Sequence, residues 1–156
     1  NLYSTLLNLS RNIFFYEKAN LKDNFETRIY LMFFHFSILM LIYKKKNKQF
    51  KQENYDFLFH SIENDLRELG FGDVSVNKKM KEFNKILYDI LLKIDLTEIN
   101  DGFTINKSLL KKYFDSLISS ENDKLSVMAR YFDVFFSFCF ELSADNMIES
   151  IKKFKY

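Results

Sequence analysis

The 156-residue sequence contains no proline, no tryptophan, one cysteine and three glycines. Without proline, neither proline-kinked helices nor proline-rich linkers are expected. The single cysteine, Cys139, cannot form a disulfide within the chain, so a reducing compartment is allowed but not required. A strong charge of one sign is also missing, because 23 basic residues face 21 acidic ones and the net charge is +2. A dedicated nucleic-acid-binding protein is usually more basic, so we expect no DNA partner.

Apolar residues are abundant: they make up 47% of the sequence and include 19 phenylalanines and 9 tyrosines. This content is too apolar for a disordered chain, and the length fits one domain over residues 1–156 with a substantial core. The longest apolar run, residues 29–43, would span about 22 Å as a helix. A hydrocarbon core is about 30 Å thick, so we do not expect a membrane span there.

Apolar residues recur at spacings of three and four along most of the chain, and no convincing pair of strands is visible. The pattern predicts an all-α, single-domain bundle of six or seven helices joined by short loops. Asp23, followed by Glu26, is typical of a capping box, and Thr104 can cap a later helix. The predicted helices cover about residues 2–16, 23–44, 55–70, 76–94, 105–118, 121–142 and a short segment after Ser143.

Two of the three glycines lie one residue apart within NDLRELGFGDVSVNKKMKEF, residues 64–83. Gly70 follows an apolar helical stripe and can adopt the left-handed conformation that ends a helix. Gly72 allows a second change of direction, and Asp73 or Ser75 can then cap the next helix. The stretch therefore predicts a corner between two helices that fold their apolar stripes together.

For the histidines, their acidic neighbours and the cysteine, the sequence favours structural roles over catalysis or metal binding. Asp56, His60 and Glu63 share one helical face at a spacing that metal-binding helices use, and a metal-dependent helical enzyme is one hypothesis. No second ligand set accompanies them, so we expect ordinary charge pairs and neither a metal nor a cofactor. His35 lies in an aromatic run, which favours a core or interface histidine. Cys139 has no base nearby, so we expect no catalytic residue.

A lysine cluster follows directly after the apolar run. It can hold a protein at an anionic membrane surface, at ~1 kcal/mol per lysine, or it can be a solvated loop, and the sequence leaves both open. A membrane-surface helical adaptor without enzymatic activity, built on Phe36, Leu39 and these lysines, is an alternative function. The lysines concerned are Lys44, Lys45, Lys46 and Lys48.

The glycine corner resembles the signature of the ubiquinol–cytochrome c chaperone family, the assembly factors of respiratory complex III. Two positions depart from the family pattern: Phe71 stands where a valine is expected, and Asn77 where a proline is frequent. The resemblance is strongest over residues 1–95 and includes Phe25, Glu26 and His35 upstream. The matching positions in the signature are Leu66, Arg67, Glu68, Gly70, Gly72, Asp73, Ser75, Val76, Lys78 and Lys81.

The resemblance implies an all-α chaperone without enzymatic activity. Family members bind newly made cytochrome b and hold it for assembly into ubiquinol–cytochrome c reductase. Mitochondrial members work with a small partner protein and at the ribosomal tunnel exit. A peripheral location is implied, at the cytoplasmic face of a bacterial inner membrane or the matrix side of the mitochondrial inner membrane.

The resemblance also assigns roles at the corner. Candidates for client or partner contact are Arg67, Glu68, Asp73, Lys78 and Lys81. The residues that would shape the corner are Gly70, Gly72 and Ser75.

Overall fold

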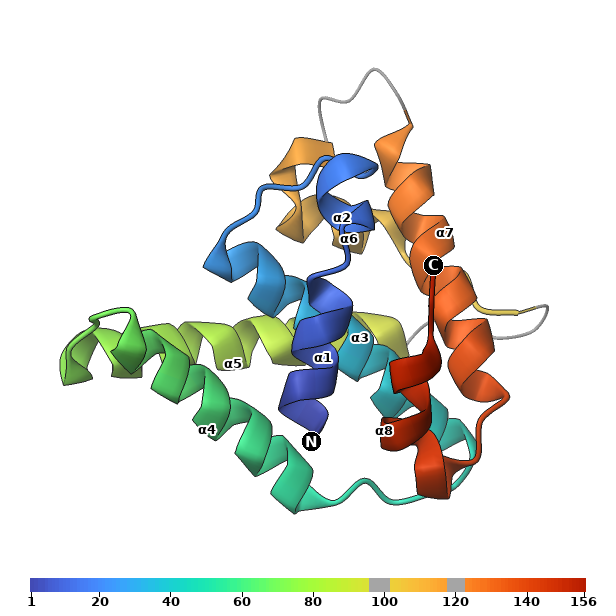
Figure 1. Cartoon of the computed structure of the whole chain (residues 1–156), viewed down its shortest axis with the longest axis horizontal. Helices are drawn as coiled ribbons and strands as arrows, with labels where there is room; N and C mark the ends of the chain where they lie inside the picture. Colours follow the sequence, from blue (N-terminus) through green and yellow to red (C-terminus); the bar gives the residue numbers. More distant parts are fainter. Residues whose placement is uncertain (96–101, 118–122) are drawn as a thin grey trace.

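A computed structural model of the protein describes residues 1–95, 102–117 and 123–156 (Figure 1). Regular structure in these residues is helical, with six α-helices of seven residues or more, two α-helices of four residues, three 3₁₀ turns and no strand. The predicted all-α architecture of six or seven helices is therefore confirmed. The α-helices are α1 (Leu2–Ser10), α2 (Phe14–Glu17), α3 (Phe25–Lys45), α4 (Gln52–Glu68), α5 (Asp73–Asp95), α6 (Lys107–Tyr113), α7 (Lys124–Phe140) and α8 (Met147–Ser150).

The central helix is α3, which packs against α1, α5 and α7 (Figure 1). All residues from 31 to 39 are buried, so this stretch has no polar face and no hydrophobic periodicity. Among the described residues α3 is the one helix long and apolar enough to cross a membrane by length and composition. However, 67% of that apolar window is buried inside the protein. Packing against neighbouring helices therefore accounts for the apolar run.

His35 lies within an aromatic cluster that joins α2, α3 and α7. The rings of Phe15, Tyr131, Phe132 and Phe135 surround its imidazole at centroid distances between 4.8 and 5.9 Å. All four contacts are edge-on, a geometry that aromatic pairs prefer over a face-to-face sandwich. The cluster places a polar side chain in the centre of the core, so its nitrogens need partners.

Both ring nitrogens of His35 have such partners. Nδ1 lies 2.6 Å from the carbonyl oxygen of Leu31, which can only accept, so Nδ1 carries the proton. Nε2 then accepts a hydrogen bond from the Tyr131 hydroxyl at 2.7 Å. Complete burial lowers the pKa of His35 to about 4, although the bond to Leu31 acts in the opposite direction. His35 is thus a neutral core histidine that ties α3 to α7.

Helices α4 and α5 form a hairpin whose corner extends away from α7 and α8 (Figure 1). Two backbone hydrogen bonds close the end of α4: Gly70 donates to Arg67 at 3.0 Å, and Phe71 donates to Leu66 at 3.2 Å. This pattern is a Schellman motif, which places the residue after the C-cap in the left-handed region. Gly70 occupies that position with a φ of 97°, so the predicted role of this glycine is confirmed.

Gly72 does not share the left-handed conformation of Gly70. Its φ is not positive, and a Cβ at this position would meet no atom within 4 Å. Its carbonyl oxygen accepts from the Val76 N–H at 2.9 Å, which places Gly72 at the N-cap of α5. The prediction that Asp73 or Ser75 caps this helix is wrong, because both residues lie within its first turn.

Two other predicted N-caps are displaced by one or two positions. Asn24 caps α3 and accepts a backbone hydrogen bond at 2.9 Å, whereas Asp23 forms an ion pair with Arg28. Asn106, not Thr104, caps α6. Several neighbouring side chains are competent caps in each segment, and the position where the helix enters the core selects one of them.

The first predicted helix, over residues 2–16, is interrupted. α1 ends at Ser10 and α2 begins at Phe14, where the Asn12 side chain accepts from the Phe14 N–H at 3.0 Å. An asparagine side chain that bonds to nearby backbone competes with helix continuation. The predicted helix boundaries at 118 and 121 lie outside the described residues.

The two corner glycines are expected to respond oppositely to substitution. Gly70→Ala forces a side chain into the left-handed region and should lower the free energy of unfolding by about 1 kcal/mol. Gly72→Ser supplies a better N-cap without strain and should raise it by a few tenths of a kcal/mol. Urea unfolding monitored by circular dichroism measures both. Equal destabilisation by the two substitutions would contradict the assignment.

Burial of neutral His35 predicts that stability falls on acidification. The pKa of His35 is about 4 in the folded protein and 6.5 in an unperturbed histidine, so between these values the unfolded chain binds a proton that the folded chain does not. The contribution is fully present above pH 6.5 and decreases by about 3 kcal/mol as the pH falls towards 4. Urea unfolding across this range measures the slope. In a His60→Gln background the remaining imidazole NMR signal belongs to His35, and its titration near pH 6.5 would refute the prediction.

Candidate binding surfaces

The α4–α5 corner is fixed by ion pairs that centre on Arg67. One guanidinium nitrogen lies 3.1 Å from a Glu63 carboxylate oxygen, one helical turn earlier, and the other donates to Asp73 at the start of α5. These hydrogen bonds raise the pKa of Arg67, with the bond to Asp73 contributing most. Two of the predicted contact residues, Arg67 and Asp73, are thus bonded to each other and hold the two helices at the corner.

The other predicted contact residues leave their charges unengaged. Glu68, Lys78 and Lys81 are exposed, and no ion pair joins them to another residue in the described part of the chain. Lys79 between them differs, because its Nζ lies 3.7 Å from Glu26 and 5.2 Å from the centroid of the Phe71 ring. The corner therefore offers Lys78 and Lys81 as cations available to a partner.

Three apolar side chains are exposed at the same corner, and the sequence analysis did not identify them. The exposed fractions are 58% for Leu69, 36% for Phe71 and 84% for Val74. These residues flank the two glycines, between the last turn of α4 and the first turn of α5. Apolar residues placed next to a glycine corner are the sequence signal that could have found them, since the turn directs them away from both apolar stripes.

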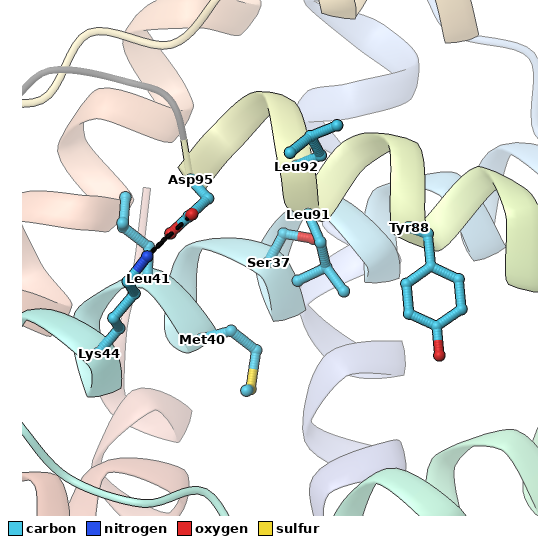
Figure 2. A pocket seen from close by; sticks show the side chains of 8 residues that line it. All are labelled: Ser37, Met40, Leu41, Lys44, Tyr88, Leu91, Leu92 and Asp95. Carbon is cyan, nitrogen blue, oxygen red and sulfur yellow. Dashed lines mark hydrogen bonds and ion pairs between the residues drawn. The ribbon is translucent and has the colours of Figure 1, made fainter.

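An apolar groove of about 400 Å³ lies between α3 and the C-terminal half of α5 (Figure 2). One end is closed by Lys44, whose Nζ lies 2.7 and 2.9 Å from the two carboxylate oxygens of Asp95. Tyr88 and Leu92 on its rim are 62% and 54% exposed. The lining residues are Ser37, Met40, Leu41 and Lys44 from α3, and Tyr88, Leu91, Leu92 and Asp95 from α5.

Ser37 contributes a buried polar atom to this groove. The residue is 1% exposed, and its hydroxyl has no hydrogen-bond partner among the described residues. Ser37 and Leu91 both line the groove, Ser37 from α3 and Leu91 from α5 (Figure 2). A buried hydroxyl without a partner destabilises the folded state.

Another hollow, of about 480 Å³, lies between α1, α3 and α4 and has a mixed lining. Glu68 and Leu69 of the corner form part of it, together with Arg11 and Arg28. The Tyr3 hydroxyl at its edge donates to Asp65, and burial raises the pKa of Tyr3. The corner thus continues into a hollow that carries charges of both signs.

The lysine cluster after α3 does not form a uniform basic patch. Lys44 is paired with Asp95, and Lys46 donates to the Leu142 carbonyl and lies 5.3 Å from the Phe140 ring centroid. Lys45 and Lys48 are exposed.

The apolar residues that the membrane-adaptor hypothesis requires at the surface are not exposed. Phe36 and Leu39, on which that hypothesis was built, are fully buried and unavailable to lipid.

The described residues contain no group of three His, Cys, Asp or Glu side chains that could hold a metal ion. Asp56 accepts from Gln52 at 3.0 Å, and Glu63 is paired with Arg67, so these residues do not form a ligand set with His60. Cys139 is fully buried, and burial raises the pKa of its thiol.

A helical bundle with a projecting charged corner and an apolar groove is typical of a protein that binds other proteins. Comparison with protein families agrees with this class: the model of the ubiquinol–cytochrome c chaperone family matches residues 17–154. The chain belongs to that family, and membership implies a chaperone role and a client protein. The match extends past residue 95 and includes α6, α7 and α8, where the sequence analysis found little pattern. No curated protein and no solved structure matched.

Removing the unpartnered hydroxyl is expected to stabilise the protein. Ser37→Ala should raise the free energy of unfolding by about 1 kcal/mol, because it relieves an unsatisfied buried group within a helix. Ser10→Ala is the matched control, since Ser10 is equally buried and helical but donates to the Leu6 carbonyl at 2.8 Å. Urea unfolding compares the two variants. A loss of stability in both would show that the Ser37 hydroxyl is satisfied.

Proposed function

We propose that the protein is an assembly chaperone that binds newly made cytochrome b and promotes assembly of ubiquinol–cytochrome c reductase. The observation that carries this proposal is the family match over most of the chain, residues 17–154. The exposed apolar and cationic groups at the α4–α5 corner support it, since a chaperone needs a surface that an incompletely assembled client can cover. Such a protein catalyses no reaction and works by binding the unassembled client more tightly than the assembled one.

The corner is the proposed contact for the client or for a small partner chaperone subunit. Val74, Lys78 and Lys81 would contact it directly, while the ion pairs of Arg67 keep the corner rigid. A rigid, preorganised surface loses little conformational entropy on binding. The ribosome near the tunnel exit is a further proposed partner, because a newly made client is first available there.

The proposed location is peripheral, at the membrane into which cytochrome b is inserted. This is the cytoplasmic face of the inner membrane in a bacterium, or the matrix side of the inner membrane in a mitochondrion. The family role in assembling a respiratory complex supports a place beside the membrane. Exposed Lys45 and Lys48 would add a weak attraction to anionic lipid.

Charge reversal at the corner tests the proposal. The double substitution Lys78→Glu and Lys81→Glu should weaken capture of cytochrome b at least five-fold, because both cations are exposed and unpaired in the described structure. Affinity purification of the tagged chain from its host, with quantitative mass spectrometry of cytochrome b, measures the effect. The helical circular dichroism spectrum should not change.

The control is a double reversal of equal charge at Lys153 and Lys155, two exposed residues at the other end of the chain. Both double variants change the net charge from +2 to −2, since each reversal removes two positive units. Unchanged capture by the corner variant, or an equal loss in both variants, would show that the corner does not contact the client. Photocrosslinking from position 78 identifies the partner that lies against it.

A further inference from the structure

We propose that the groove between α3 and α5 binds an uncharged, apolar α-helical segment of the client. This inference rests on the proposed function for the identity of the client, but the chemistry of the occupant follows from the groove itself (Figure 2). The groove lies at the far end of α5 from the corner and is a second, separate contact surface.

The lining residues are spaced so that they form one continuous stripe along each helix, and a third helix can pack between two such stripes. Both helices contribute residues at positions i, i+3, i+4 and i+7: Ser37, Met40, Leu41 and Lys44 on α3, and Tyr88, Leu91, Leu92 and Asp95 on α5. Each set spans about 10 Å at ~1.5 Å per residue, or two helical turns. Two helices in contact with such parallel stripes receive a third helix between them, as in other helix-in-groove complexes.

The charges of the groove select a neutral occupant. Its charged lining residues are Lys44 and Asp95, and each neutralises the other through two contacts of 2.7 and 2.9 Å. The remaining surface is aliphatic, thioether and aromatic, apart from the hydroxyls of Ser37 and Tyr88. A charged segment seated here would lose its hydration without gaining a counter-charge.

The apolar side chains on the rim of the groove are exposed, so a bound partner could bury them. Tyr88 and Leu92 project from α5 with more than half of their surface exposed, whereas Leu87 and Ile90 on the same helix are fully buried. Met40 opposite them has the flexible, polarisable side chain that adapts to different apolar sequences. An apolar helix would cover these residues, and the segments of a membrane protein that lack charge have this chemistry.

A fluorescent peptide measures binding to the groove without reference to the client. The probe is an uncharged leucine–alanine helix of about 20 residues with one central tryptophan and glutamine at both ends. The chain has no tryptophan, so all emission excited at the red edge belongs to the peptide. Leu92→Glu should weaken binding at least ten-fold, since it places a carboxylate on a half-buried apolar contact.

Val134→Glu is the matched control, because Val134 is a partly exposed apolar residue on α7, which does not line the groove. It should bind the peptide as the unmodified chain does. No binding by the unmodified chain, or equal weakening by both variants, would overturn the proposal. If the unmodified chain self-associates and Leu92→Glu abolishes this in light scattering, a second copy covers the groove and the proposal also fails.

The charge at the end of the groove offers an independent test. Asp95→Asn leaves Lys44 without its carboxylate and should shift preference towards a peptide in which one leucine is replaced by glutamate. The swapped pair, Lys44→Asp with Asp95→Lys, keeps the groove neutral and should retain the preference for the uncharged peptide. Identical preferences in all three proteins would contradict selection by charge.

Measuring the capture of cytochrome b tests the groove proposal separately from the proposed function. If the unmodified chain and Leu92→Glu capture it equally, the function stands and the groove is not its site. If the peptide binds in the groove and cytochrome b is not captured, the groove stands and the client assignment is wrong. Loss of capture in Leu92→Glu but not in Val134→Glu supports both.

Discussion

The arrangement of this protein depends on burying a helix that has no polar side. α3 is buried along residues 31–39 without interruption, so it must be surrounded and cannot lie on a surface. α1, α5 and α7 meet this requirement, and they come from the beginning, middle and end of the chain. The hydrogen bond between His35 and Tyr131 fixes the register of α7 against α3, because the Tyr131 hydroxyl reaches Nε2 only in that register. A polar group satisfied inside an apolar core favours one packing among many with similar burial.

The same requirement explains where binding surfaces remain. α5 packs against the central helix, and its N-terminal end extends outward with α4 (Figure 1). Leu69, Phe71 and Val74 are exposed at this end. At its other end α5 runs beside α3 with an uncovered seam between them (Figure 2). The two surfaces lie about 27 Å apart along one helix, counted from Val74 to Leu92 at ~1.5 Å per residue.

Sequence reasoning identified what depends on local chemistry and missed what depends on tertiary pairing. Periodicity predicted the all-α architecture but not the break between α1 and α2. Gly70 was sufficient to predict the corner, since a left-handed residue ends α4. The caps failed because Asp23, Asn24 and their neighbours are chemically equivalent until packing fixes where the helix begins. The groove could not be predicted at all, because its two walls are brought together by contacts such as Lys44 to Asp95, across 51 residues of sequence.

The residues of the family signature fall into two groups when they are placed on the structure. Arg67, Asp73 and Gly70 maintain the geometry of the corner, through ion pairs in the first two cases and backbone conformation in the third. Lys78 and Lys81 do nothing visible for the fold, which is why they remain the candidates for contact. A signature match alone cannot separate these roles, because both kinds of residue would be retained in a working chaperone.

If the client binds at the groove and the corner as proposed, its release requires no conformational change of the chaperone. Affinity at these two surfaces would depend on apolar surface that the client offers only while it is unassembled. Once other subunits cover that surface, the contact area disappears and the free energy of binding falls with it. The ion pairs of Lys44 with Asp95 and of Arg67 with Asp73 join neighbouring helices beside these two surfaces. On this proposal, assembly of the client is sufficient to drive its transfer.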